Sequence, residues 1–78
     1  GMTNYLRMVE GTEVAIYVRG KKDGTNKVSM RSGGNVDVSK IAIHFGGGGH
    51  ARAAGYTMYG NIDDEKKALL DVVEVMLK

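Results

Sequence analysis

Four consecutive glycines, Gly46–Gly49, are followed directly by His50 and, two residues later, by Arg52. Backbone without side chains lets a ligand approach the peptide N–H groups directly. An imidazole and a guanidinium at the rim add hydrogen-bonding and cationic groups, so this order of residue types suits the binding of an anion. The alternative is a flexible linker. The run lies between a helix-like apolar segment and a strand-like segment, which favours a ligand-binding loop.

A second candidate loop is Arg31-Ser32-Gly33-Gly34. A guanidinium at a strand end, beside a hydroxyl and two glycines, can hold a phosphate or carboxylate in fork geometry. Taken alone, this segment is better interpreted as an ordinary strand end with a solvated arginine. The presence of two such loops in one short chain strengthens the anion-binding interpretation of both.

The remaining chemistry-bearing residues are sparse. The chain has two histidines, His44 and His50, and no cysteine. No Asp-His-His or His-x-Asp cluster is present, so the sequence offers no metal ligand set, disulfide or thiolate. Ser32 near His50 is conceivable as a nucleophile but has no support. His50 is either a surface histidine or a ligand contact, whereas the helical position of His44 favours a plain surface residue.

The flanking segments predict the elements that position these loops. Alternating β-branched residues predict strands over 13–19 and 27–32, joined as a hairpin through an Asp23-Gly24 turn, and a third strand over 55–59. Residues 37–45 are expected to form a short helix, with Asp37 as N-cap and Gly46 in the position that follows a helix end. Residues 3–10 are expected to be a helical turn or a linker. A last helix is expected from Asn61 or Asp63 through Lys78.

Apolar spacing predicts which faces are buried. The expected stripe of the last helix comprises Ala68 or Leu69, Val72, Val73, Met76 and Leu77, and that of the short helix comprises Val38, Ile41, Ala42 and Phe45. The summed pattern predicts a single α+β domain over 3–78, with a small mixed sheet of about three to five strands and helices packed on it. One sheet face is expected to be thinly covered and to carry Tyr17, Arg19, Lys27, Ser29 and Arg31.

Composition sets limits on the function. Seventy-eight residues make one small domain, and Gly1-Met2 are typical of a tag remnant. The net charge of +2 suits an anionic ligand but is low for a protein that coats DNA. No long apolar run or secretory signal predicts a membrane segment.

Four blocks in order resemble the DHHA1 domain, the C-terminal substrate-binding domain of the DHH phosphoesterases. These blocks are Val28–Ser32, Val36–Ala42, Phe45–His50 and Ala53–Gly55. The resemblance covers nearly the whole chain from about Glu10. It is nearest to the oligoribonuclease branch, whose members act on very short RNAs, 3′-phosphoadenosine 5′-phosphate and cyclic-di-AMP products. Arg52 and Met30 depart mildly from the commonest pattern.

The resemblance implies a division of labour. A separate N-terminal DHH domain would bind two manganese ions, and the present chain would supply the other wall of the cleft, without a cofactor of its own. Arg31 and Ser32 would correspond to the family's Arg-Ser segment. Gly46, Gly47, Gly48 and Gly49 would form the glycine loop, with His50 facing the scissile phosphate and Arg52 nearby. The implied partners are short single-stranded RNA or nucleotide phosphates, the DHH domain and a second copy in a homodimer, and the implied location is cytoplasmic.

Three alternatives stay open. DHHA1-like segments occur at the end of alanyl-tRNA synthetases, where they serve RNA binding and dimerisation, but those usually lack the histidine after the glycines. A fragment of an exopolyphosphatase-like hydrolase is the second alternative, and a purely structural dimerisation module is the third. An Asp-His-His block upstream would decide the class of the parent protein.

Overall fold

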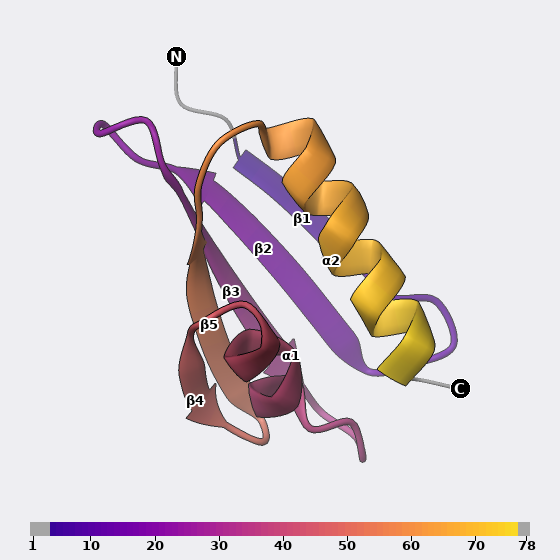
Figure 1. Ribbon diagram of the computed structural model, residues 1–78. Helices are drawn as coiled ribbons and strands as arrows, with labels where there is room; N and C mark the ends of the chain where they lie inside the picture. Colours follow the sequence, from indigo (N-terminus) through magenta and orange to yellow (C-terminus); the bar gives the residue numbers. More distant parts are fainter. Residues whose placement is uncertain (1–3, 77–78) are drawn as a thin grey trace.

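A computed structural model describes residues 4–76 of the chain. Within these residues a five-stranded sheet in the order β1-β2-β3-β5-β4 carries both helices on one face (Figure 1). The elements are β1 (Asn4–Met8), β2 (Val14–Gly20), β3 (Asn26–Ser32), α1 (Val38–His44), β4 (Gly48–His50), β5 (Ala53–Met58) and α2 (Ile62–Met76). The expected α+β class is confirmed. All neighbouring strands pair antiparallel, whereas a mixed sheet was expected.

The hairpin of β2 and β3 forms as predicted, with Val18 opposite Val28. Its turn is closed by the Asp23 carboxylate, which accepts hydrogen bonds from the backbone N–H and the hydroxyl of Thr25. These bonds hold the pKa of Asp23 below its usual value. Gly24 has a φ of +90°, a conformation that glycine adopts without steric cost.

The core lies between the sheet and the helices. Alternate residues of β2, β3 and β5 point to this side, as the period of a strand requires. The largest fully buried side chains are Ile16, Met30, Ile41, Met58, Leu69, Val14, Val18, Val28 and Val38. The buried residues of these three strands all lie on the helix side, and none of their residues on the opposite face of the sheet is buried.

Helix α1 begins and ends as its sequence predicts. The Asp37 carboxylate caps the first turn by accepting from the backbone N–H of Ser39. At the other end, the N–H groups of Gly46 and Gly47 donate to the carbonyls of Ile43 and Ala42, at 3.0 and 2.8 Å. Together with the φ of +84° at Gly46, this is a Schellman motif.

Helix α2 is capped by the Asn61 side chain, which accepts from the N–H groups of Asp63 and Asp64. Leu69 and Val73 are buried as expected, but Met76 is 42% exposed, so the buried stripe ends earlier than predicted. The expected Leu77 and Lys78 lie outside the described residues. Over the described range, no helix is long and apolar enough to cross a membrane.

Two strands differ from the expectation. Residues 4–8 form strand β1 along β2, where a helical turn or a linker was predicted, and Thr3 is outside the described residues. Tyr5 of this strand lies opposite Val18, and Lys66 of α2 sits over its ring at 4.2 Å from the centroid. Gly48–His50 form the short strand β4, which glycine's low strand propensity concealed.

Candidate functional site

The face of the sheet opposite the helices presents three rows of side chains that run across the strands. Residues that pair directly share a face, so the register assigns each row. The first row is Met8, Ala15, Arg31, Ala53 and His50; the second is Leu6, Tyr17, Ser29, Gly55 and Gly48; the third is Asn4, Arg19, Lys27 and Thr57. These rows define the open face.

The open face is cationic. Arg31 and His50 stand in its first row and Arg19 and Lys27 in its third, and no residue of the three rows is acidic. From β3 to the β4 edge of the sheet, the middle row consists of Ser29, Gly55 and Gly48. The hydroxymethyl group of Ser29 is the largest side chain in this part of the row. A strip of small residues therefore runs between the row of Arg31 and the row of Arg19 and Lys27, and the Lys27 side chain borders it at Gly55, where a Cβ would lie 3.5 Å from its Nζ. Such a strip attracts and can seat a phosphate chain.

Arg31 and His50 occupy one row with Ala53 between them. Adjacent strands are about 4.8 Å apart, which places the backbones of Arg31 and His50 about 10 Å from each other. Both side chains are exposed. Only the methyl group of Ala53 separates them, so the two long polar side chains can converge on one anion.

The two candidate loops of the sequence meet at this end of the sheet. The backbone N–H of Ser32 donates to the carbonyl of Arg52 at 2.9 Å, and the Arg52 guanidinium donates to the carbonyl of Gly33 at 3.2 Å. The β4–β5 turn is therefore bonded to the end of β3. Arg52 remains exposed beside the first row.

Ser32 lies apart from the other predicted site residues. It is next to Arg31 in the strand, so its side chain points to the helix side, where it is 6% exposed. Its hydroxyl has no hydrogen-bond partner within the described part of the chain. The structure therefore separates the Arg-Ser pair across the two faces of the sheet.

The glycine run has a different constraint at each position. The amides of Gly46 and Gly47 are engaged in ending α1, as described above. A Cβ at Gly47 would lie 2.2 Å from the carbonyl oxygen of Gly55, and a Cβ at Gly49 would lie 2.5 Å from the Cα of Ala54. The fold therefore excludes side chains at Gly47 and Gly49.

Gly48 is the exception within the run. A Cβ there would meet nothing within 4 Å, and its φ lies outside the left-handed region that favours glycine. Gly48 lies opposite Gly55 on the open face. Neither space nor backbone conformation therefore requires glycine at this position. The absence of a side chain leaves the backbone of Gly48 open to close approach by a ligand.

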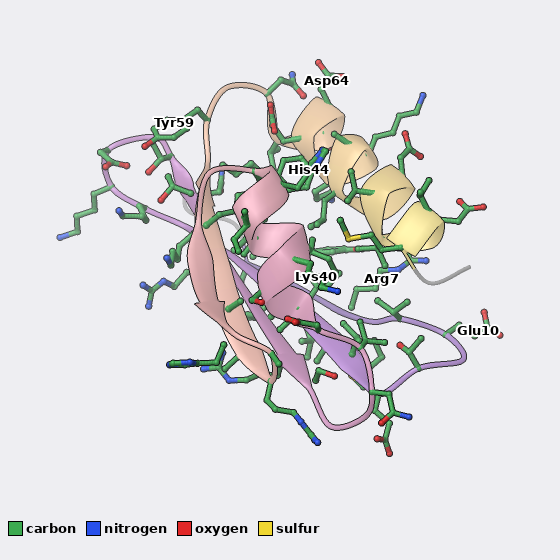
Figure 2. The ribbon with its side chains drawn as sticks, turned by 60° about the horizontal axis from the view of Figure 1, so that its bottom comes forward. Arg7, Glu10, Lys40, His44, Tyr59 and Asp64 are labelled. Atoms are coloured by element: carbon green, nitrogen blue, oxygen red, sulfur yellow. The ribbon has the colours of Figure 1, made fainter. Side chains whose placement is uncertain are left out.

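A hollow of about 390 Å³ adjoins the glycine run at the N-terminal end of β4. It is lined by Lys27, Phe45, Gly46, Gly47, Gly48, Gly55, Tyr56, Thr57 and Tyr59. Tyr59 is 67% exposed, and its side chain is labelled in Figure 2 beside the chain that follows β5. Sequence reasoning missed this hollow, because it depends on β4 being shorter than β5.

The wall of the hollow is fixed by two stacked rings. The rings of Phe45 and Tyr56 are 4.8 Å apart and nearly parallel. Burial raises the pKa of the Tyr56 hydroxyl, and the charge of Glu65 adds to the effect. Tyr56 is 3% exposed and belongs to the hydrophobic core.

The second histidine lies elsewhere. His44 is exposed at the end of α1 and faces α2 in Figure 2, on the helix side of the sheet. His44 therefore does not share a site with His50, in agreement with its interpretation from the sequence as a plain surface residue. Among the described residues no group of three or more His, Cys, Asp or Glu side chains could hold a metal ion.

Comparison with known proteins gives two findings. A family model described as the DHHA1 domain matches residues 1–78. The chain is also 42% identical, over 69 residues, to the bifunctional oligoribonuclease and PAP phosphatase NrnA of Thermus thermophilus. That match covers 87% of this chain but 21% of the relative, so the chain spans about a fifth of the relative's length.

Proposed function

Because the chain belongs to the DHHA1 domain family, we propose that it is the nucleotide-binding part of a DHH phosphoesterase. The proposed substrates of the parent enzyme are short RNAs, phosphoadenosine phosphate or the linear products of cyclic dinucleotides. Support for this class comes from the similarity to a relative whose name describes an oligoribonuclease and PAP phosphatase. The absence of cysteine suits the cytoplasmic location included in the proposal.

The observation that carries the proposal is the first row of the open face. In this proposal, Arg31 and His50 hold the oxygens of one phosphate from its two sides, above the methyl group of Ala53. A guanidinium binds phosphate oxygens through paired charge-assisted hydrogen bonds. Gly48 allows the ligand to approach the backbone, and the exposed Arg52 adds charge at the rim. The Ser32 side chain lies on the opposite face, and its backbone N–H bonds the end of β3 to the carbonyl of Arg52.

Bond cleavage requires groups that the described residues do not bring together. DHH enzymes are generally metal-dependent, and this part of the chain holds no cluster fit for a metal. In the proposed enzyme, two manganese ions would therefore bind to a separate DHH domain and activate the attacking water. The role of this chain is to orient the phosphate toward that domain and to hold it during transfer.

Titration with AMP, monitored by amide shifts in NMR spectra, tests the proposal. Shifts are expected at Arg31, Gly48, His50 and Arg52 and not along α2. Half a cleft leaves the nucleotide exposed, so we expect a Kd of roughly high micromolar to millimolar order. Arg31→Ala should weaken binding.

Arg7→Ala is the matched control for that variant, because Arg7 is exposed but lies on the helix side of β1 (Figure 2). Its removal subtracts the same charge and should leave affinity for AMP nearly unchanged. Equal losses in the two variants would show that net charge alone attracts the nucleotide, and shifts confined to α2 would contradict the site itself.

A further inference from the structure

An apolar patch borders the cationic rows on the open face. It consists of Leu6 and Met8 of β1 and Tyr17 of β2, which are 66%, 61% and 39% exposed. Leu6 lies directly opposite Tyr17 across the β1–β2 pair. Met8, two residues further along β1, is the diagonal neighbour of Tyr17. We call these three residues the β1–β2 patch. They lie at the far side of the sheet from the glycine run.

Tyr17 stands at the boundary between this patch and the positive charges. On the β1 side its neighbours are Leu6 and Met8, whereas on the β3 side Ser29 is directly opposite and Lys27 and Arg31 are diagonal. Arg19 follows on the same face of its own strand. Diagonal neighbours lie about 7–8 Å apart, within reach of long side chains. One side of the ring is therefore apolar and the other cationic.

This arrangement matches the chemistry of a nucleotide. A nucleobase presents an apolar π-face, and the phosphate attached to the same unit is anionic. Aromatic side chains on a sheet, bordered by positive charge, bind single-stranded nucleic acid by stacking the bases and neutralising the backbone. An apolar protein surface would instead bury the charges of Lys27 and Arg31 without supplying an opposite charge, which is costly. Charge complementarity thus favours a nucleotide as the occupant.

We propose that Tyr17, supported by Leu6 and Met8, is a stacking platform for a nucleobase of a short oligonucleotide whose phosphates lie along the cationic rows. This inference rests on the proposed function and adds a second contact, on β2, to the phosphate contact of Arg31 and His50. It also implies that ligands bearing bases gain affinity that a bare phosphate chain does not.

The test compares a 5′-phosphorylated diadenylate with tripolyphosphate, both titrated into the 78-residue chain by calorimetry. Tyr17→Ala is expected to weaken diadenylate binding about tenfold and to leave tripolyphosphate binding unchanged. Tyr17→Phe keeps a ring and should retain diadenylate affinity. Val75→Ala, which removes a 71% exposed apolar side chain from α2, is the matched control. Thermal melts and sedimentation accompany each variant.

Each other outcome is informative. Unchanged diadenylate binding by Tyr17→Ala would overturn the platform and leave the proposed function standing. Equal weakening of both ligands would also overturn it, because a stacking contact cannot affect tripolyphosphate. A loss of self-association in Tyr17→Ala without a loss of binding would assign the β1–β2 patch to a second copy of the chain. Failure of the unmodified chain to bind either ligand would overturn the proposed function as well.

Discussion

Arg31 and His50 both pair with Ala53, from its two sides, although they lie on different strands and 19 positions apart in the chain. Strand β5, which lies between β3 and β4, therefore places Arg31 and the histidine that follows the glycine run in one row. The small side chain of Ala53 leaves the space above it open. The relationship suggests that Ala53 is as important to the proposed phosphate site as either polar residue.

Filling that space is the first prediction. Ala53→Val adds two methyl groups between Arg31 and His50 and suits a strand, so the fold should be kept. We expect AMP binding to weaken by at least about tenfold, which corresponds to about 1.4 kcal/mol. Calorimetric titration measures the affinity, with thermal melts as the check on folding.

Ala15→Val is the matched control. Ala15 pairs with Arg31 from the opposite side and shares the same face, so the substitution changes the same row without entering the gap beside His50. Its affinity for AMP should equal that of the unmodified chain. A similar loss in both variants would place the phosphate elsewhere on the row.

Ser32 provides a second prediction, because its hydroxyl is buried on the helix side without a partner. Ser32→Ala removes a buried polar group that makes no hydrogen bond in the described structure. The free energy of unfolding should stay the same or rise by up to about 1 kcal/mol. Affinity for AMP should be unchanged. A marked loss of affinity with an unchanged melt would show that the hydroxyl reaches the ligand after all.

The sequence predicted the hairpin, both helices and the residues of the open face well, because these depend on local signals. Alternation identified β2 and β3, and Asp37 and Gly46 marked the limits of α1. The shared face of Tyr17, Arg19, Lys27, Ser29 and Arg31 followed from period two alone, and the register confirms it.

The non-local pairings could not be predicted in this way. β1 contains Arg7 and Asn4 among its apolar residues, and its strand conformation depends on pairing with β2. β4 is a glycine segment whose extended conformation depends on β5. The opposite directions of Arg31 and Ser32 were implied by the strand period, but the resemblance to a family motif grouped the two residues as one contact.

A third prediction concerns pH and the cap of α1. The hydrogen bond from the Ser39 hydroxyl holds the pKa of the Asp37 carboxyl below its usual value of 3.8. A lowered pKa in the folded state means that this cap contributes its full stability above the unfolded-state pKa and loses it as the pH falls through the folded-state value. Asp37→Asn keeps an acceptor but cannot titrate.

Thermal melts of Asp37→Asn and the unmodified chain at pH 7 and pH 3 test this linkage. At pH 7 the unmodified chain should have a higher melting temperature than Asp37→Asn. At pH 3 the difference in melting temperature between the two proteins should be smaller. Other carboxylates affect both proteins alike, so the comparison isolates Asp37. A difference that stays constant between the two pH values would contradict the role of the charge.

A fourth prediction concerns catalysis. The described residues hold no cluster fit for a metal, so the 78-residue chain should not release mononucleotides from short oligoadenylates in the presence of manganese. Chromatography of the reaction mixture measures the release. Turnover above the buffer blank that survives His50→Ala would contradict the assignment of this chain to substrate binding. In a protein that includes the DHH domain, the same substitution should reduce turnover, since the imidazole would face the charge on the phosphate.

The glycine run gives the sharpest separation of folding from binding. Gly47→Ala would place a Cβ 2.2 Å from the Gly55 carbonyl oxygen, and Gly49→Ala would combine a 2.5 Å contact with a φ of +140°. Both should lower the free energy of unfolding, by about 1–3 kcal/mol from overpacking alone. Gly48→Val should leave it within about 0.5 kcal/mol, because the added side chain meets nothing within 4 Å.

Gly48→Val should nevertheless abolish AMP binding, because its side chain would stand on the open face opposite Gly55 and block the strip between the cationic rows. Gly48→Ala, with a smaller group, should give an intermediate affinity at the same thermal stability. This graded loss at constant stability is what a ligand in contact with the backbone of Gly48 requires. If Gly48→Val binds AMP as the unmodified chain does, β4 is only a structural edge of the sheet and the phosphate does not approach it.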